Sequence, residues 1–126
     1  MLKSRLDLGK SGEEAAADFL KENGYKILAR NYRLKLGEID IVAEEKDTVC
    51  FVEVKTRSSY KFGLPQEALS NFKQRQIGKV ALVYLKAHGL LNKKARFDVV
   101  SVECLADEPR INLIKNAFEL NPNFTY

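Results

Sequence analysis

The chain has few of the residues from which disulfide frameworks, zinc sites and membrane spans are built. Its 126 residues include two cysteines, Cys50 and Cys104, which lie far apart and belong to no CxxC or Cys/His cluster. This pattern argues against a disulfide framework and a zinc site, and favours reduced, buried thiols. No stretch approaches the roughly 18 apolar residues that a bilayer span requires, and charged residues precede any apolar run at the N-terminus. We therefore expect a soluble, cytoplasmic protein that makes no membrane contact.

Internal repeats and low-complexity segments are also missing, so nothing in the sequence divides the chain. A length of 126 residues falls in the usual range for one domain, and a hydrophobic content of 45% is enough for one core. We expect a single domain over residues 1–120. Residues 121–126 have no periodicity and are expected to form a C-terminal tail.

Positive charge is concentrated in one part of the chain. The net charge is +4, but residues 61–96 carry eight Lys or Arg residues and a single acid, Glu67, which gives a local charge of +7. The remaining sequence is net acidic, at −3. A separated positive region is the footprint expected of a protein that binds a polyanion such as nucleic acid, although many basic helix faces are only solvated.

The spacing of apolar residues predicts the element order α, β, β, β, α, β, β. The first helix is expected over residues 11–23, with an earlier start left open, because Ser11 and Glu14 have capping-box spacing and Asn23 and Gly24 form a typical stop. Alternating and β-branched runs predict strands at 25–33, 38–44, 48–56, 96–103 and 111–118, the first three as a meander. The expected fold class is α/β, with a mixed central sheet flanked by helices.

The second helix is expected after the chain break at residues 63–65 and ends at His88 and Gly89. We expect Gln66 and Glu67 to cap its start, although residues that contact a substrate would look the same in sequence. Five of its apolar side chains have roughly helical spacing and should face the core: Leu69, Phe72, Ile77, Val80 and Tyr84.

Charged residues interrupt two strands that would otherwise be good core strands. Asp40 stands among the aliphatic residues of the second strand, and Glu53 and Lys55 alternate with those of the third. Charged residues are disfavoured in strands, so this conflict often marks function. Because side chains alternate along a strand, Glu53 and Lys55 should share one face with Val49 and Phe51.

The register of this hairpin decides whether the charged residues meet. An even-numbered loop of two residues (46–47) or four (45–48) places Asp40 opposite Glu53, and Glu38 opposite Lys55. Facing carboxylates repel each other unless a cation lies between them, and carboxylate oxygens suit Mg²⁺ or Mn²⁺ together with waters and substrate phosphate. Lys55 would lie beside the metal, where its amine could orient or help deprotonate an attacking water.

A plainer interpretation stays open. Glu53 and Lys55 would then form an ordinary salt bridge on an exposed strand face, and Asp40 would pair with another base. An odd-numbered loop without a bulge would place Asp40 and Glu53 on opposite faces and break the site. Asp98, an acid in a later strand, has two explanations as well. It could have a role in the site, or it could form an ion pair with Arg96, which shares its face.

Four short segments resemble the bacterial YraN family of restriction-endonuclease-like proteins. They are Gly12-Glu13-x-x-Ala16, Gly37-Glu38-Ile-Asp40, Phe51-Val-Glu53-Val-Lys55-Thr-Arg57 and Arg96-Phe-Asp98-Val-Val, and the resemblance extends from about Gly9 to Phe118. The family looks like a branch of the PD-(D/E)xK nucleases, similar in layout to archaeal Holliday-junction resolvases. The resemblance implies a restriction-endonuclease-like core, αβββαβ plus a C-terminal strand, although Ile39 stands where the nominal motif has proline.

The same resemblance implies the roles of the site residues. Asp40 and Glu53 would be metal ligands, Lys55 the catalytic lysine, and Glu13 a helix glutamate that completes the catalytic and metal site. Glu13 has a second explanation, because a carboxylate in the first turn of a helix complements the helix dipole by about 0.3 to 1 kcal/mol.

Basic residues that could hold substrate phosphates lie in two kinds of position. Arg33 and Arg57 stand at strand ends, and an Arg guanidinium can bind a phosphate through two hydrogen bonds. Lys73, Arg75 and Lys79 belong to the second helix, where they could follow a phosphate backbone. Surface ion pairing and simple solvation explain these residues equally well.

The function that these observations predict is hydrolysis of nucleic-acid phosphodiester bonds by a Mg²⁺- or Mn²⁺-dependent endonuclease. DNA, branched or otherwise structured, is the expected substrate, and a homodimer would fit because paired cuts need paired sites. Two alternatives stay open: a catalytically silent nucleic-acid-binding module of the same fold, and a scaffold whose acidic and basic regions serve a protein partner. The sequence does not distinguish duplex, single-stranded and junction substrates.

Overall fold

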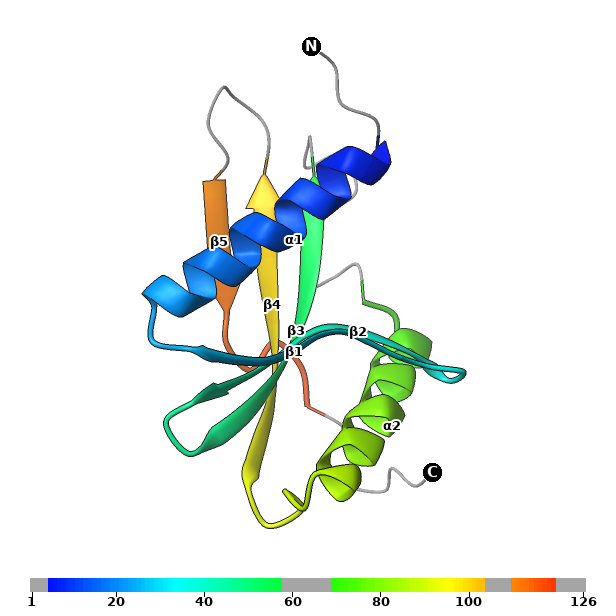
Figure 1. Cartoon of the computed structure of the whole chain (residues 1–126). Coiled ribbons are helices and arrows are strands. Elements are labelled where there is room, and N and C mark those ends of the chain that lie inside the picture. The colour runs from blue at the N-terminus through cyan, green and yellow to red at the C-terminus, as the bar shows by residue number, and fades with distance from the viewer. Residues whose placement is uncertain (1–4, 58–68, 104–109, 120–126) are drawn as a thin grey trace.

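The computed structural model describes residues 5–57, 69–103 and 110–119, with side chains described from Ser11 onward. Within these ranges the chain forms two helices and a five-stranded sheet (Figure 1). The elements are α1 (Arg5–Glu22), β1 (Lys26–Leu34), β2 (Gly37–Glu45), β3 (Thr48–Arg57), α2 (Asn71–Ala87), β4 (Lys94–Glu103) and β5 (Arg110–Ile114). The predicted element order and the mixed α/β architecture are confirmed. The predicted tail at 121–126 lies outside the described residues.

The strands lie side by side in the order β1-β2-β3-β4-β5. β1, β2 and β3 form the predicted antiparallel meander, and β5 is antiparallel to β4. β3 and β4 are parallel, so the chain must cross over between them, and α2 lies in this crossover. β3 is therefore the central strand, with a hydrogen-bonded neighbour on each side.

The two helices cover opposite faces of the sheet, and two apolar clusters result. Leu20 of α1 packs in one cluster with Val52 of β3, and Figure 1 shows α1 crossing in front of β3 and β4. Val80 of α2 packs in the other cluster with Phe51 of β3. Phe51 and Val52 are consecutive, and side chains alternate along a strand, so the two clusters lie on opposite faces of β3.

α1 has the earlier start that the sequence left open, and not the capped start at Ser11. It starts at Arg5, so Ser11 lies inside the helix and the predicted capping box with Glu14 is wrong. No proline interrupts residues 5–10, and their single glycine is not enough to end a helix. The longer helix also changes the argument about Glu13, which lies about two turns beyond the helix start. A first-turn dipole effect therefore no longer explains this residue.

α2 begins at Asn71, behind Ser70, whose hydroxyl accepts a hydrogen bond from the N–H of Lys73 at 3.1 Å. The caps predicted from sequence, Gln66 and Glu67, lie outside the described residues.

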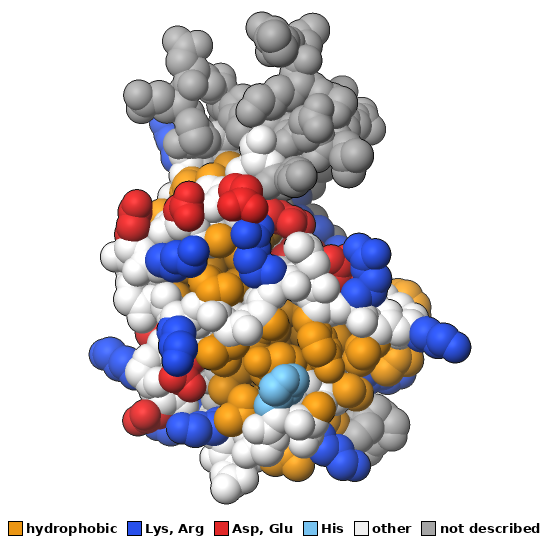
Figure 2. Space-filling model, in the orientation of Figure 1, with side chains coloured by type: hydrophobic (Ala, Val, Ile, Leu, Met, Phe, Trp, Pro, Cys, Tyr) orange, Lys and Arg blue, Asp and Glu red, His pale blue; other side chains and the backbone are white. Residues whose placement is uncertain are grey.

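The core prediction holds for Leu69, Ile77, Val80 and Tyr84, which are buried. It is wrong for Phe72, whose side chain is 70% exposed. Successive positions on a helix are turned by about 100°, so Lys73 shares the inward face of Ile77 and Phe72 points away from it. Hydrophobic side chains also reach the surface over α2 and the β1–β2 hairpin (Figure 2).

β5 ends at Ile114, although a strand was predicted to continue to residue 118. Asn116 adopts a positive φ of 53°, and its N–H donates to the carboxylate of Asp98 at 2.9 Å. The next N–H, of Ala117, donates to the Phe97 carbonyl at 2.8 Å. These bonds turn the chain back onto β4, and local sequence gives no sign of them.

Cys50 is a buried free thiol, as predicted, whereas Cys104 lies outside the described residues. Burial raises the pKa of the Cys50 thiol to about 11, so it stays protonated at neutral pH. Neither helix in the described ranges is long and apolar enough to cross a membrane.

Candidate active site

The β2–β3 hairpin has the register that the sequence predicts. Its turn is the two-residue loop 46–47, with Lys46 at a φ of +54°. The paired residues run from Glu45↔Thr48 to Ile41↔Val52. The loop is therefore even-numbered, and the hairpin has the register that the metal-site hypothesis requires.

The ladder between β2 and β3 ends just before those two residues. Residues 37–39 of β2 stay paired with β1 but have no partner on β3. The predicted pairs Asp40–Glu53 and Glu38–Lys55 are therefore not part of the ladder. We call the opening between residues 37–40 of β2 and residues 53–57 of β3 the β2–β3 fork.

Asp40 lies where the fork begins, and its carboxylate replaces a backbone acceptor. Its Oδ2 accepts a hydrogen bond of 2.8 Å from the Val54 N–H. A buried backbone N–H that lost its ladder partner would cost free energy without such a bond. The carboxylate of Asp40 thereby joins β2 to β3 at the position where their backbones separate.

β3 presents Glu53 and Lys55 on the face predicted from alternation. Val49 and Phe51 pack in the cluster beneath α2, and Glu53 continues this face as a buried side chain. The Oε1 atom of Glu53 lies 3.8 Å from the Lys55 Nζ. The salt bridge of the plainer interpretation thus exists, but its carboxylate is buried rather than exposed.

α2 contributes a second lysine to the same carboxylate. The Lys73 Nζ lies 3.2 Å from the Glu53 Oε1, closer than the Nζ of Lys55. Sequence reasoning counted Lys73 only among possible phosphate contacts. Its proximity to Glu53 depends on the crossover through α2, which no local pattern reveals.

α1 approaches β3 closely at a glycine, and the following residue is Glu13. A Cβ built on Gly12 would collide with the Thr56 side chain of β3. Burial and the neighbouring carboxylates of Glu38 and Glu53 raise the pKa of Glu13. Glu13 is thus within electrostatic reach of the fork.

Burial and neighbouring carboxylates disfavour the ionisation of Asp40 and Glu13, whose pKa values are both raised. Burial raises the pKa of Asp40 to about 7, the charge of Glu53 adds to this effect, and the hydrogen bond from Val54 opposes it. Burial and the neighbouring ammonium of Lys73 lower the pKa of Lys55. The site therefore contains acids that resist deprotonation and a lysine that loses its proton more easily than a solvated one.

These donors fit a divalent cation with few protein ligands. In the described ranges no three Asp, Glu, His or Cys side chains gather closely enough to hold a metal ion, so Asp40, Glu53 and Glu13 do not form a ready three-ligand set. Asp40 and Glu53 remain as two crowded oxygen donors. Mg²⁺ commonly binds through one or two carboxylates, with waters and substrate phosphates completing its shell.

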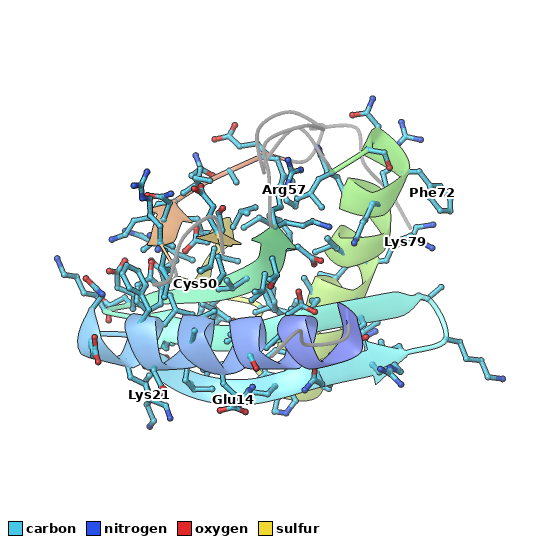
Figure 3. All side chains as sticks on the ribbon, turned by 90° about the horizontal axis from the view of Figure 1, so that it is seen from above. Glu14, Lys21, Cys50, Arg57, Phe72 and Lys79 are labelled. Atoms are coloured by element: carbon cyan, nitrogen blue, oxygen red, sulfur yellow. The ribbon has the colours of Figure 1, made fainter. Side chains whose placement is uncertain are left out.

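The predicted phosphate-binding residues do not form one surface. Lys73 contacts Glu53, and Arg57 lies at the end of β3 beyond Lys55 (Figure 3). Arg33 forms an exposed ion pair with Glu38 at 3.2 Å. Arg75 is exposed on α2, and Lys79 lies on the outer side of that helix (Figure 3). Of the helix bases, only Lys73 reaches the fork.

Asp98 belongs to a separate polar network. Its Oδ1 accepts from the Arg96 Nε at 2.8 Å, which confirms the intrastrand ion pair. Arg96 also donates to the Tyr25 hydroxyl and to Glu45, both at 3.0 Å. These bonds join three segments of the chain, so the presence of an acid in β4 is explained by structural pairing.

Comparison with known proteins finds relatives whose sequences match most of the length of this chain. The model of the uncharacterised protein family UPF0102 matches residues 12–102, a range that holds every residue of the fork. A UPF0102 protein of Syntrophus aciditrophicus is 53% identical over 115 residues, covering 91% of both chains. A UPF0102 protein of Caldicellulosiruptor saccharolyticus is 51% identical over 117 residues, covering 91% of this chain and 99% of the relative.

Proposed function

This chain belongs to the uncharacterised protein family UPF0102, and from the chemistry of the β2–β3 fork we propose that it is a metal-dependent nuclease. Its substrate would be the phosphodiester backbone of nucleic acid, with DNA favoured and branched or structured DNA expected. The proposal includes the finer assignments suggested by the sequence: a restriction-endonuclease-like core and a relationship to the YraN and PD-(D/E)xK proteins. It also includes a cytoplasmic location.

One observation carries the proposal: two carboxylates and a lysine from neighbouring strands meet where those strands separate. Asp40 bonds the Val54 N–H at 2.8 Å, and Glu53 lies beside Lys55 at 3.8 Å. Crowded carboxylates cost stability in a purely structural role. A divalent cation would relieve this repulsion, which supports a binding function for the pair.

The metal would be Mg²⁺ or Mn²⁺, held by Asp40 and Glu53, and when bound it would supply Lewis-acid polarisation of the phosphate. Lys55 provides the adjacent amine. Its lowered pKa favours transient loss of a proton, so Lys55 can accept a proton from an attacking water or hold that water in place. In its charged form the same amine stabilises negative charge that develops on the phosphate oxygens.

Lys73 has a different role in this proposal. Its ammonium lies 3.2 Å from Glu53 and keeps that buried carboxylate paired. With a cation held by Glu53, Lys73 would be repelled by the added positive charge and could then pair with a substrate phosphate. Glu13 contributes negative potential at the rim of the fork.

The experiment is a cleavage assay with linear duplex, nicked duplex, single-stranded and four-way-junction DNA, each with Mn²⁺ or with EDTA. We expect Mn²⁺-dependent cleavage of at least one substrate, and loss of cleavage in Glu53→Gln. Glu14→Gln is the matched control, because Glu14 is an exposed carboxylate paired with Arg30 at 2.9 Å. DNA binding that is unchanged in EDTA, without cleavage of any substrate, would instead identify a silent binding module. A protein without DNA affinity would contradict both.

A further inference from the structure

The exposed large hydrophobic side chains of the described residues gather on one side of α2. They are Leu36 (46% exposed), Phe72 (70%), Val83 (40%) and Leu91 (55%). Single exposed apolar residues are ordinary on a protein surface, but a contiguous group marks an interaction site. Figure 2 shows hydrophobic side chains collected over α2 and the β1–β2 hairpin.

Three of these residues line one hollow, which we call the α2 groove. Its volume is about 310 Å³, and its walls are Leu36, Lys79, Leu82, Val83, Lys86 and Leu91. Leu36 comes from the β1–β2 turn, whereas Leu91 follows the end of α2. A concave site with apolar walls accepts protruding side chains better than a flat surface does.

The charges of the α2 groove have one sign. Lys79 and Lys86 are its charged wall residues, and α2 as a whole carries four basic residues and no acid. The ion pairs found within the described residues do not involve either lysine. A bound surface should therefore supply carboxylates beside its apolar groups.

This combination selects among possible occupants. A second copy of the chain, packed by two-fold symmetry, would place the lysines of one groove against those of the other. Nucleic acid would match the lysines, but the walls of the groove itself include no aromatic side chain on which a base could stack. An amphipathic helix with acidic residues beside its apolar stripe satisfies both the walls and the charges.

We propose that the α2 groove docks an acidic amphipathic helix of a partner protein. Apolar side chains of that helix enter between Leu36 and Val83, and its carboxylates pair with Lys79 and Lys86. The two lysines are seven positions apart, which is about 10 Å along a helix, so acids two turns apart on the partner can reach both. Lys79, one of the groove's wall residues, lies on the outer side of α2 (Figure 3), so a partner bound there leaves the fork open. This proposal does not depend on nuclease activity.

The test uses a fluorescein-labelled amphipathic peptide with a leucine stripe flanked by glutamates, and its counterpart with lysines in place of the glutamates. We expect the glutamate peptide to bind the full chain in fluorescence anisotropy, more weakly at high salt, and to shift the methyl NMR signals of Leu36, Val83 and Leu91. Lys79→Glu with Lys86→Glu should weaken binding at least about tenfold and favour the lysine peptide. Lys21→Glu with Lys26→Glu is the matched charge control.

Lys86 is exposed and Lys79 is half-buried, so reversing their charges leaves no core cavity, and the charge variants should unfold near the wild-type temperature. Val83→Ser gives a second, uncharged test. Equal binding of both peptides, or binding of neither, would overturn the proposal. Methyl shifts that appear only on dilution or concentration of the chain would assign the groove to a second copy. Shifts produced by anionic phospholipid vesicles but not by the peptide would assign it to a membrane surface.

Discussion

Glu53 and Lys55 stand two residues apart, yet their replacement should have different consequences. Glu53→Gln removes one of two anionic donors, so Mn²⁺ affinity should fall together with cleavage. Lys55→Met removes a positive charge beside the site, so the metal should bind at least as well while cleavage falls roughly 10²- to 10³-fold. Calorimetric Mn²⁺ titration beside single-turnover cleavage separates the two effects. Normal cleavage by Lys55→Met, or wild-type Mn²⁺ affinity in Glu53→Gln, would contradict these roles and leave a structural salt bridge as the explanation of the pair.

Asp40 should make the metal-free protein less stable as the pH rises. Its folded pKa of about 7 lies above the unfolded value, so its folded state binds the extra proton. The contribution of Asp40 to the free energy of unfolding is therefore fully present below about pH 4 and is lost as the pH rises through 7. Asp40→Asn keeps an acceptor for the Val54 N–H and removes the charge.

In EDTA at pH 8, Asp40→Asn should be more stable than wild type by about 1 to 3 kcal/mol, a value reduced from the full shift because the site is partly solvated. At pH 4 the two proteins should unfold alike. Urea denaturation at both pH values measures the difference, with Asp18→Asn as the exposed control. A gain of equal size at both pH values would show that the effect does not come from ionisation.

Among the secondary-structure elements, α1 depends on a glycine for its distance from β3. Gly12→Ala places a methyl group against Thr56, so the helix must move or the side chain must rotate. Although alanine is the better helix former, overpacking of this kind should destabilise the fold by about 1 to 3 kcal/mol. Thermal unfolding measures the loss. The double variant with Thr56→Ser keeps the clashing hydroxyl, whereas Thr56→Ala removes it, so only the latter should restore stability.

The elements show how far sequence reasoning reaches. The β2–β3 register followed from loop parity, and the shared face of Glu53 and Lys55 followed from alternation, because both rules are local. The fork could not be predicted, since its opening depends on a side chain of Asp40 bonding the backbone of another strand. Lys73 was assigned to a phosphate surface for the same reason: its distance to Glu53 is set by the packing of α2 on the sheet. The restriction-endonuclease-like assignment stays a prediction.

For the molecule as a whole, the positive charge of residues 69–96, the part of the basic region that the structure describes, does not gather in one place. Lys73 lies at the fork, whereas Lys79 lines the α2 groove. Lys73→Ala with Arg57→Ala should lower the slope of log affinity against log salt by roughly two for DNA, because each phosphate contact contributes about one. Lys79→Ala should leave this slope unchanged. Fluorescence anisotropy with labelled DNA from low to moderate salt measures it, and an unchanged slope in the double variant would move the DNA surface elsewhere.

A homodimer stays part of the nuclease proposal, and sedimentation velocity tests it. The α2 groove should not form its interface, because Lys79 and Lys86 would face their own copies. A dimer that dissociates in Lys79→Glu would contradict this separation.

The hydrogen bond from Val54 to Asp40 gives the fork an internal reporter. The Val54 amide proton is held by a titratable side chain rather than by a neighbouring strand, so its resonance frequency should follow the ionisation of Asp40. Its exchange with deuterated water should also slow when a bound cation fixes the carboxylate, while amides deeper in the same hairpin keep their rates. One nitrogen-bound proton could thus register occupancy of the site without substrate, turnover or an added label.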